Sequence, residues 1–177
     1  TTYYKNFSFL EKIVSKIVFP FLRWWDVRTS RDMDLIIANS NFISKRILKF
    51  WGKTSKVVFP PINISDFKIS NDTKKYFLVI SRHVGYKKID IAIKAFKKLN
   101  IDLKIIGDGP ETEKLKLLSE NSKNIEFLGW VTDTVKKDYL SNCKALIFPG
   151  IEDFGITPIE AMASGRPVIA YKDGGAL

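Results

Sequence analysis

The sequence predicts an α/β fold in which a mostly parallel sheet is flanked by helices. From residue 76 onward, short apolar runs alternate with amphipathic segments of helical spacing. Such alternation is typical of βαβ units, whose strands are covered on both faces and therefore contain continuous apolar runs. Composition agrees, because 45% of the 177 residues are hydrophobic and 27% are charged. These values provide for a packed core and exclude a disordered chain.

The chain divides into two parts of different pattern. Residues 1–61 precede the regular alternation, and large apolar side chains crowd positions 7–25. Their spacing predicts an amphipathic helix that is broken or kinked near Pro20. Residues 62–75 are polar and rich in turn formers, so we interpret them as a linker. The second domain then covers residues 76–177.

The rest of the first part predicts a small strand–helix–strand unit. A short buried strand is expected at 34–38, a helix over 41–50 and a further strand at 57–59. Polar residues of the Asn39-Ser40-Asn41 string should cap the helix, and Gly52 should end it.

The second domain should alternate strictly between strands and helices. The expected strands cover 76–81, 102–106, 124–128, 144–148 and 167–171. The expected helices cover 87–99, 110–120, 132–142 and 157–164. In open parallel sheets ligands bind beyond the carboxyl ends of the strands, so the residues that follow each strand are the candidates for a site.

The loop after the first of these strands is basic. It contains Arg82, Lys87 and Lys88 just before a helix N-terminus, which suits an anion site. A solvated basic loop explains the composition equally well. His83 is the single histidine of the chain, and without a partner we expect it to be structural.

The next strand leads into the string Gly107-Asp108-Gly109-Pro110-Glu111. The glycines permit a tight turn, and Pro110 suits the first position of the following helix. Asp108 or Glu111 could touch a ligand, but a tight strand-to-helix turn is the favoured interpretation. The string lacks the third glycine of a dinucleotide-binding fingerprint.

The segment 149–165 contains most of the candidate chemistry. The backbone amides of four consecutive residues should point outward at a helix start, where the dipole also favours an anion. These residues are Phe154, Gly155, Ile156 and Thr157. Glu152 precedes the loop and Glu160 lies near the first helical turn. The segment therefore combines carboxylates, which can bind sugar hydroxyls, with backbone amides, which can bind phosphate. That combination suits a phosphorylated sugar, although Glu160 could simply stabilise its own helix.

Net charge adds a further constraint. The chain carries 29 Lys and Arg against 19 Asp and Glu, and residues 1–60 hold 11 of these bases against four acids. Such an excess attracts nucleic acid, anionic lipid or phosphorylated ligands. The single cysteine excludes an internal disulfide and a cysteine-rich zinc site. No apolar run reaches about 18 residues, so no membrane span is expected.

Taken together, the motifs resemble the retaining glycosyltransferases of family four, which have the GT-B fold. Glu152 and Glu160 match the E-x7-E motif of that family, within EDFGITPIEAMASGRPVIA. Arg82 and Lys87 match the family's basic pair that holds the donor diphosphate. The resemblance extends over nearly the whole chain, through the strings WDVRTSRDMD, ANSNFISKRI, VVFPPI, GDGPE, FLGWVTD, ALIFPG and DGGA.

The resemblance implies a Rossmann-like donor-binding domain preceded by the end of an acceptor-side, Rossmann-like N-terminal domain. Arg82 and Lys87 would neutralise the diphosphate, with help from amides around Gly155 to Thr157. Glu152 would contact the transferred sugar, and Glu160 would hold the ribose.

The resemblance also implies which residues would lie near the base of the donor nucleotide. The loop Val131-Thr132-Asp133 would border the base. In mannosyltransferases of this family, an Asp and a Lys at the places of Asp133 and Lys136 touch guanine. Asp133 is equally well explained as a helix cap.

The implied function is retaining transfer of a hexosyl group from a nucleotide sugar, with GDP-mannose favoured, to a glycan or lipid-linked acceptor of polysaccharide biosynthesis. No metal or other cofactor is required in such enzymes, and we read the Asp32-Met33-Asp34 string as turn and cap chemistry. We expect the chain to lack activity by itself, because the acceptor domain is mostly absent from it.

Several alternatives and partners stay open at this stage. A synthase-type GT-B enzyme using UDP- or ADP-glucose shares the two glutamates. A nucleic-acid-binding protein would interleave bases and aromatics on an open sheet face, whereas the aromatics here crowd one segment, so no nucleic-acid partner is expected. We expect a cytoplasmic enzyme. The basic, apolar stretch from Phe7 to Arg31 suits contact with the anionic inner face of the plasma membrane. Alternatively, this stretch belongs to the packing of the core and the hinge.

Overall fold

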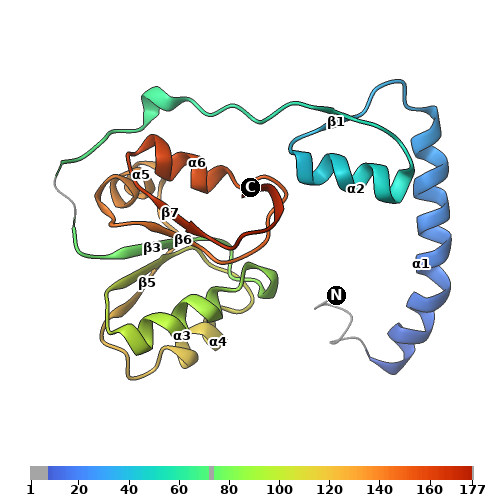
Figure 1. The fold of residues 1–177 in the computed structure, drawn as a ribbon. Coiled ribbons are helices and arrows are strands. Elements are labelled where there is room, and N and C mark those ends of the chain that lie inside the picture. The colour runs from blue at the N-terminus through green and yellow to red at the C-terminus, as the bar shows by residue number, and fades with distance from the viewer. Residues whose placement is uncertain (1–7, 72–73, 177) are drawn as a thin grey trace. The chain divides into compact units, whose positions relative to one another are not determined.

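The computed structural model describes residues 8–71 and 74–176, and the chain forms two compact units, 1–59 and 60–177 (Figure 1). Phe7, at the start of the predicted first helix, lies outside the described residues. The described part of the predicted linker is irregular apart from a short 3-10 helix, Ile64–Asp66. Phe67 packs against a core cluster of the second unit, which anchors this segment there.

The first unit begins with one long helix. α1 spans Phe9–Thr29 and starts with a capping box, in which the Ser8 hydroxyl accepts from the Glu11 amide and the Glu11 carboxylate accepts from the Ser8 amide. The helix continues through Pro20, so the predicted break is wrong. Proline removes one intrahelical hydrogen bond. The hydrogen bonds in the turns on both sides of Pro20 are sufficient to keep the helix continuous despite that loss.

The remaining elements of this unit are small. After a 3-10 turn, Ser30–Asp32, strand β1 (Ile37–Ala38) pairs in parallel with β2 (Lys56–Val57). Both strands are shorter than predicted. Helix α2 (Asn41–Trp51) lies between them. The Ser40 side chain caps it and Gly52 ends it in the left-handed conformation, so both predicted helix signals are confirmed.

The second unit contains a five-stranded parallel sheet in the order β5-β4-β3-β6-β7. The strands are β3 (Phe77–Ile80), β4 (Leu103–Ile106), β5 (Ile125–Gly129), β6 (Leu146–Phe148) and β7 (Val168–Ala170). The helices are α3 (Ile89–Leu99), α4 (Thr112–Leu118), α5 (Asp133–Asn142) and α6 (Ile156–Ala163). All nine elements predicted for this domain are therefore present, and no end is shifted by more than two residues.

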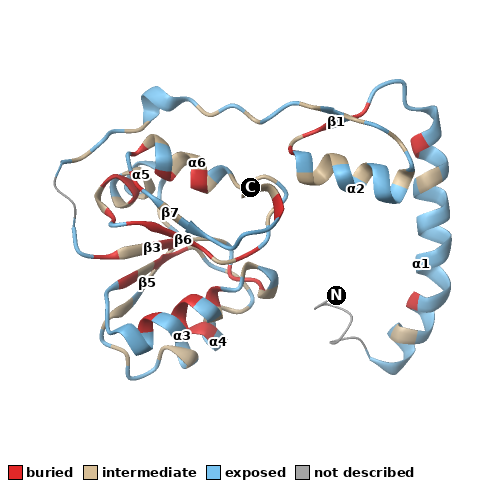
Figure 2. Cartoon of the chain, viewed as in Figure 1, coloured by how far each residue is buried: buried red, intermediate tan, exposed pale blue. Residues whose placement is uncertain are grey.

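Helices cover both faces of this sheet. Figure 1 shows α3 and α4 on one side and α5 and α6 on the other. Along β3, Leu78 and Val79 belong to different core clusters, because successive side chains of a strand point to opposite faces. The buried residues run along the central strands (Figure 2). The sheet is thus a doubly covered layer with its carboxyl-end loops exposed to a ligand.

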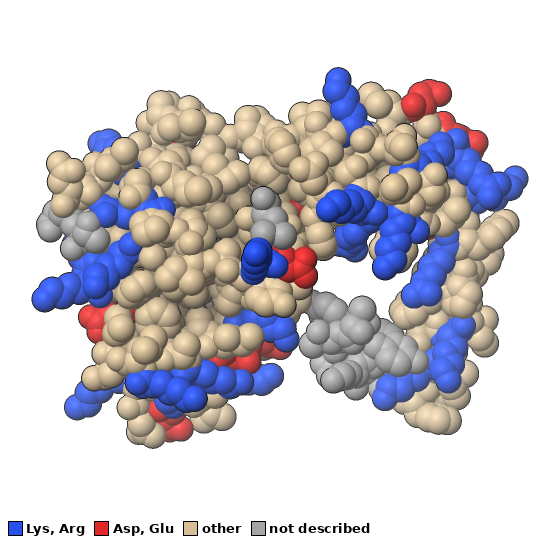
Figure 3. All heavy atoms as spheres, viewed as in Figure 1, with Lys and Arg blue, Asp and Glu red and all other residues tan. Residues whose placement is uncertain are grey.

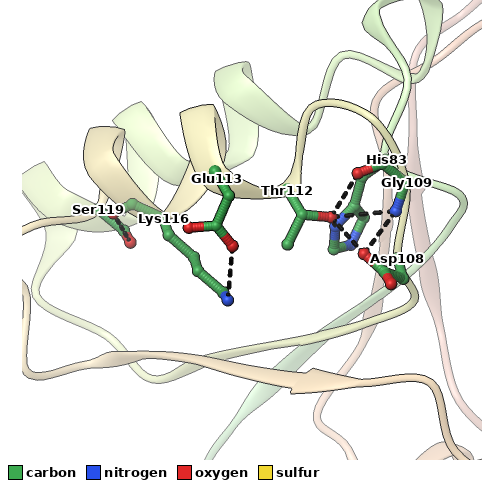
Figure 4. A network of polar contacts seen from close by, with 7 residues as sticks. All are labelled: His83, Asp108, Gly109, Thr112, Glu113, Lys116 and Ser119. Atoms are coloured by element: carbon green, nitrogen blue, oxygen red, sulfur yellow. Dashed lines mark hydrogen bonds and ion pairs between the residues drawn. The ribbon is translucent and has the colours of Figure 1, made fainter.

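One buried histidine ties two of these loops together (Figure 4). His83 is fully buried, and a hydrogen bond of 2.8 Å joins its Nδ1 to Thr112 Oγ1. The His83 amide donates to the Asp108 carbonyl at 2.9 Å, and the Glu111 amide donates to the His83 carbonyl at 3.1 Å. Its ring also lies edge-on to Phe127, with centroids 5.9 Å apart. His83 therefore has a structural role.

The same network corrects the predicted start of α4. Pro110 lies two residues before the first helical residue, Thr112, and Glu111 stands at the cap position. The Thr112 hydroxyl donates to Asp108 Oδ1 at 2.6 Å, while the Gly109 amide donates to Thr112 Oγ1 at 3.0 Å. These hydrogen bonds stabilise a turn that precedes the helix. The helix therefore begins after this turn, at Thr112, and not at Pro110.

Burial of His83 makes stability depend on pH. Burial lowers the pKa of His83, partly offset by the carboxylate of Asp108. A histidine with a lowered folded-state pKa binds its proton more readily when unfolded, so stability should fall as pH drops below about 6.5. The slope should reach up to about 1.4 kcal/mol per pH unit before the folded-state pKa is passed. Urea unfolding at pH 7.5, 6.5, 6.0 and 5.5 measures it.

The control is His83→Asn, which keeps a polar group near Thr112 but cannot take up a proton. We expect this variant to be less stable at pH 7.5 and to have a flatter dependence over the same range. Equal slopes in the two proteins would contradict the assignment. Carboxylates such as Asp108, whose pKa is lowered by hydrogen bonds from Thr112 and the Gly109 amide, contribute only at more acidic pH.

Candidate functional site

The strand order creates a topological switch point between β3 and β6. The chain leaves β3 toward β4 and β5 on one side, then crosses back to place β6 on the other side of β3. In open α/β sheets the crevice outside the carboxyl ends of such a strand pair is the usual ligand site. Here two loops border it, residues 81–88 after β3 and 149–155 after β6.

An ion pair joins these two loops. Lys87, in the 3-10 turn Gly85–Lys87, contacts the Oε1 atom of Glu152. Both side chains are mostly buried, with 18% and 20% of their surfaces exposed. Burial lowers the pKa of Lys87, and the nearby carboxylate of Asp153 acts in the opposite direction. The sequence predicted both residues for the site but not that they would meet.

The loops also approach each other backbone to backbone. A Cβ atom added to Gly150 would lie 2.8 Å from Lys87 Cα and 2.9 Å from the Lys87 carbonyl oxygen. A Cβ on Gly107, in the loop after β4, would lie 2.0 Å from the Ser81 carbonyl oxygen. Only glycine fits either position. The role of Gly150 was missed in the sequence, where a glycine directly after a strand and a proline was its only signal.

Arg82 remains exposed on the loop after β3. No other residue in the described ranges forms a hydrogen bond or ion pair with its guanidinium. Its five donors are therefore available to a ligand such as a phosphate, which guanidinium groups bind in bidentate fashion.

The start of α6 has the predicted character. Gly155 is its cap residue with φ +89°, and the helix begins at Ile156, one residue earlier than predicted. The amides of Ile156 and Thr157 have no acceptor within the helix because they belong to its first turn. Phe154 precedes them and is half-buried. Glu160 is the fifth residue of α6, so it lies in the second turn and not the first.

A second charged cluster connects α5 and α6. Lys136 Nζ lies 2.9 Å from Asp133 Oδ1 and 2.9 Å from Glu160 Oε1. Burial alone would lower the pKa of Lys136, but hydrogen bonds to Asp133 and Glu160 outweigh it and raise that pKa. Hydrogen bonds from Lys136 and Lys137 lower the pKa of Asp133. Glu160 thus has a charged partner on the neighbouring helix, which a purely intrahelical role does not require.

Thr132 is the N-cap residue of α5. Its hydroxyl accepts from the Val135 amide at 3.5 Å, whereas Asp133 is the first helical residue. The interpretation of Asp133 as the cap is therefore wrong, because its carboxylate is directed to lysines one turn along the helix. Val131 is half-buried in the loop between β5 and α5.

A third segment reaches the Glu152 loop from the end of the chain. The 3-10 turn Gly174–Ala176 follows β7, and the Gly175 amide donates to the Glu152 carbonyl at 2.7 Å. Asp173 shapes this turn by accepting from the Gly174 amide at 2.7 Å. The backbone around Glu152 is thereby held on two sides, by this turn and by the Lys87 loop.

The structure thus gathers the predicted residues into two contacting groups at one edge of the sheet. Lys87 pairs with Glu152, and Lys136 joins Asp133 to Glu160. Arg82, Val131 and residues 154–157 at the start of α6 lie at the same edge.

Two other features lie apart from these groups. A cavity of about 520 Å³ opens beside α3 and α4, and its lining includes Lys114, Leu117 and two residues that the sequence offered as possible ligand contacts, Lys88 and Glu111. The Asp32-Met33-Asp34 string belongs to the first unit, where Asp32 ends a 3-10 turn. Across residues 8–71 and 74–176, His, Cys, Asp and Glu side chains form no group of three or more suited to a metal.

In the described part of the chain, no helix combines the length and apolar character that crossing a membrane needs.

Known proteins with similar sequences are glycosyltransferases. The family described as glycosyl transferases group 1 matches residues 62–177. The alpha-1,3/1,6-mannosyltransferase ALG2 of Dictyostelium discoideum is 29% identical over 193 residues, covering 81% of this chain and 46% of the relative. The O-antigen chain mannosyltransferase RfbU of Salmonella typhimurium is 28% identical over 175 residues, covering 93% of this chain and 49% of the relative. The chain spans about half the length of the curated relatives it matches.

A solved structure shares the fold. Anabaena Alr3699/HepE, crystallised in complex with UDP and glucose, superposes with a TM-score of 0.71 at 24% identity, covering 85% of this chain and 49% of that protein. This likeness concerns the fold alone, and it confirms the predicted parallel α/β architecture.

The Lys87–Glu152 ion pair should couple the two loops energetically. Removing one partner of a mostly buried pair leaves the other charge uncompensated. In a double-mutant cycle of Lys87→Met and Glu152→Gln we expect a coupling energy of about 1–3 kcal/mol, measured by urea unfolding. The matched control is the exposed pair of Lys94 and Asp90, 3.0 Å apart on α3, which should couple by only about 0.3–0.5 kcal/mol. Equal coupling in both cycles would contradict the proposed link between the loops.

Proposed function

This chain belongs to the glycosyl transferases group 1 family and has the fold of GT-B glycosyltransferases, and from that premise we propose that its second unit is the donor-binding part of a retaining hexosyltransferase. The donor would be a nucleoside diphosphate sugar and the acceptor a glycan or lipid-linked glycan. The observation that carries this proposal is the meeting of Lys87 and Glu152 at the switch point, together with the contact of Lys136 on α5 with Glu160 on α6.

The diphosphate would lie between the exposed Arg82, the Lys87 ammonium and the first amides of α6. Two cations and a helix N-terminus match the charge of a diphosphate and of the nucleoside diphosphate that leaves. Lys87 is already held in place by Glu152, so it needs little reordering when the donor arrives. Glu152 would accept from hydroxyls of the transferred sugar, and Glu160 from those of the ribose.

The proposed reaction proceeds on one face of the sugar. The bond from the anomeric carbon to the leaving phosphate oxygen breaks, and a bond to the acceptor oxygen forms on the same face. The acceptor's proton passes to the leaving phosphate. The protein contributes position and charge stabilisation, and the proposal involves no metal or other cofactor.

GDP-mannose is the donor we favour. The names of the relatives ALG2 and RfbU describe mannosyltransferases. Asp133, whose side chain is 66% exposed, also lies at the start of α5, in the region where the base would lie. A synthase-type use of UDP- or ADP-glucose is the alternative. Thermal shifts with GDP, UDP and ADP distinguish them, because the preferred base should give the largest stabilisation.

The two glutamates should differ in which ligand they affect. The ribose belongs to donor and product alike, whereas only the donor carries the sugar. Glu160→Ala should therefore weaken GDP and GDP-mannose binding alike, by about tenfold to a hundredfold for a lost charge-assisted hydrogen bond. Glu152→Ala should weaken GDP binding less than Glu160→Ala does, through the loss of its hold on Lys87, while impairing donor turnover by the longer protein. Arg82→Ala should resemble Glu160→Ala, with a smaller effect at high salt.

Calorimetry with GDP and kinetics with GDP-mannose measure these effects. Loss of GDP binding in Glu152→Ala with retention in Glu160→Ala would reverse the two roles. If neither variant changed binding or turnover, the donor site would have to lie elsewhere.

We further propose that the complete enzyme is cytoplasmic and contacts an anionic membrane through α1. Exposed large apolar side chains extend along this helix, including Phe9, Ile17, Trp24 and Trp25. Figure 3 shows basic side chains along the same helix. Tryptophans with neighbouring lysines and arginines suit the interface of an anionic bilayer. The competing explanation is that another part of the longer protein covers these apolar side chains.

Co-sedimentation of the longer protein with lipid vesicles tests this. Binding should rise when phosphatidylglycerol is added to phosphatidylcholine. Replacing Lys12 and Lys16 on α1 by Gln should then reduce binding by about 30-fold, since each basic residue near the surface contributes about 1 kcal/mol. Replacing the exposed Lys98 and Lys123 of the second unit should have little effect. Binding that ignores the anionic lipid content would rule the contact out.

A further inference from the structure

Lys136 lies between two carboxylates that come from different helices. It belongs to α5, and its Nζ atom is 2.9 Å from Glu160 Oε1 on α6 and 2.9 Å from Asp133 Oδ1 on its own helix. The side chains of Lys136 and Glu160 are only 20% and 14% exposed, whereas that of Asp133 is 66% exposed. The inner contact, between Lys136 and Glu160, is therefore the one shielded from water.

This arrangement leaves little of Lys136 for a ligand base. An ammonium has three donors, and two of them are directed at Asp133 and Glu160. One donor remains, and recognition of a base edge through more than this one donor would require Lys136 to leave Asp133 or the mostly buried carboxylate of Glu160, whose loss of a partner is costly. The geometry ties Lys136 to Glu160 more closely than to any ligand.

The same contact determines what Glu160 can do. A carboxylate has two oxygens, and each can accept hydrogen bonds from sugar hydroxyls. Lys136 engages Oε1, which fixes the orientation of the group and supplies the compensating charge. The other oxygen is left for a ligand hydroxyl.

We propose that Lys136 is a positioning residue that acts through Glu160, orienting its carboxylate for the ribose hydroxyls, and that it does not read the base. This inference rests on the proposed function, in which Glu160 binds the ribose. It changes the role that the family resemblance gives to Lys136, from contact with guanine to support of the ribose site.

The test compares GDP with 2′,3′-dideoxy-GDP, which has the same base and phosphates but neither ribose hydroxyl. Calorimetry is done on the whole chain. Lys136→Met should weaken GDP binding by about tenfold while changing dideoxy-GDP binding by less than about twofold, because only GDP uses the hydroxyl contacts that Lys136 supports. Lys136→Arg should recover most of the GDP affinity, since a guanidinium can also pair with Glu160.

Lys137→Met is the matched control. Lys137 is the next residue of α5 and also pairs with Asp133, at 3.1 Å, but its other partner is Asp66 and not Glu160. This variant removes one positive charge from the same helix, so it measures the general electrostatic effect. We expect both ligands to bind it with nearly unchanged affinity.

The outcomes separate this inference from the proposal on which it rests. Equal weakening of GDP and dideoxy-GDP in Lys136→Met would mean that Lys136 touches the base or phosphates, and it would overturn the inference. Unchanged GDP binding in Lys136→Met, or the same loss in Lys137→Met, would overturn it as well. If GDP fails to bind, or Glu160→Ala leaves GDP affinity unchanged, the proposed function itself is contradicted.

Discussion

Contact between the backbones of neighbouring loops is the constraint on which the rest of the site depends. The loops after β3, β4 and β6 touch at Gly107 and Gly150, where no Cβ atom fits. Because these loops approach each other so closely, Lys87 and Glu152 are brought within contact of each other. His83 reinforces the same edge by joining the β3 loop to the start of α4. The Lys87–Glu152 ion pair at this edge of the sheet is therefore a consequence of close main-chain packing.

Much of the fold could be predicted because local patterns and tertiary structure agree. Strands covered on both faces need continuous apolar runs, and the caps of α2 depend only on Ser40 and Gly52. Predictions failed where a local rule was overridden. Pro20 did not break α1, because one missing hydrogen bond is minor in a long helix. Pro110 did not begin α4, because hydrogen bonds of Thr112 hold a turn ahead of it.

The candidate site was predictable in its position and not in its pairings. Residues that follow parallel strands must lie at one edge, so sequence order alone placed Arg82, Glu152 and Glu160 there. The pairing of Lys87 with Glu152 depends on β3 and β6 being neighbours, which strand sequence does not reveal. The contact of Lys136 with Glu160 similarly needs α5 and α6 side by side. The chemical roles of these residues remain predictions.

The hydrogen bond from the Gly175 amide to the Glu152 carbonyl also bears on how fast a ligand can be captured. The segment around Glu152 is fixed on one side by the hydrogen bond from the 174–176 turn and on the other by the ion pair with Lys87. A segment fixed in this way has little conformational entropy left to lose on binding. Capture of the proposed donor at this edge would then be governed by diffusion and electrostatic attraction, with no slow folding of the segment around the ligand.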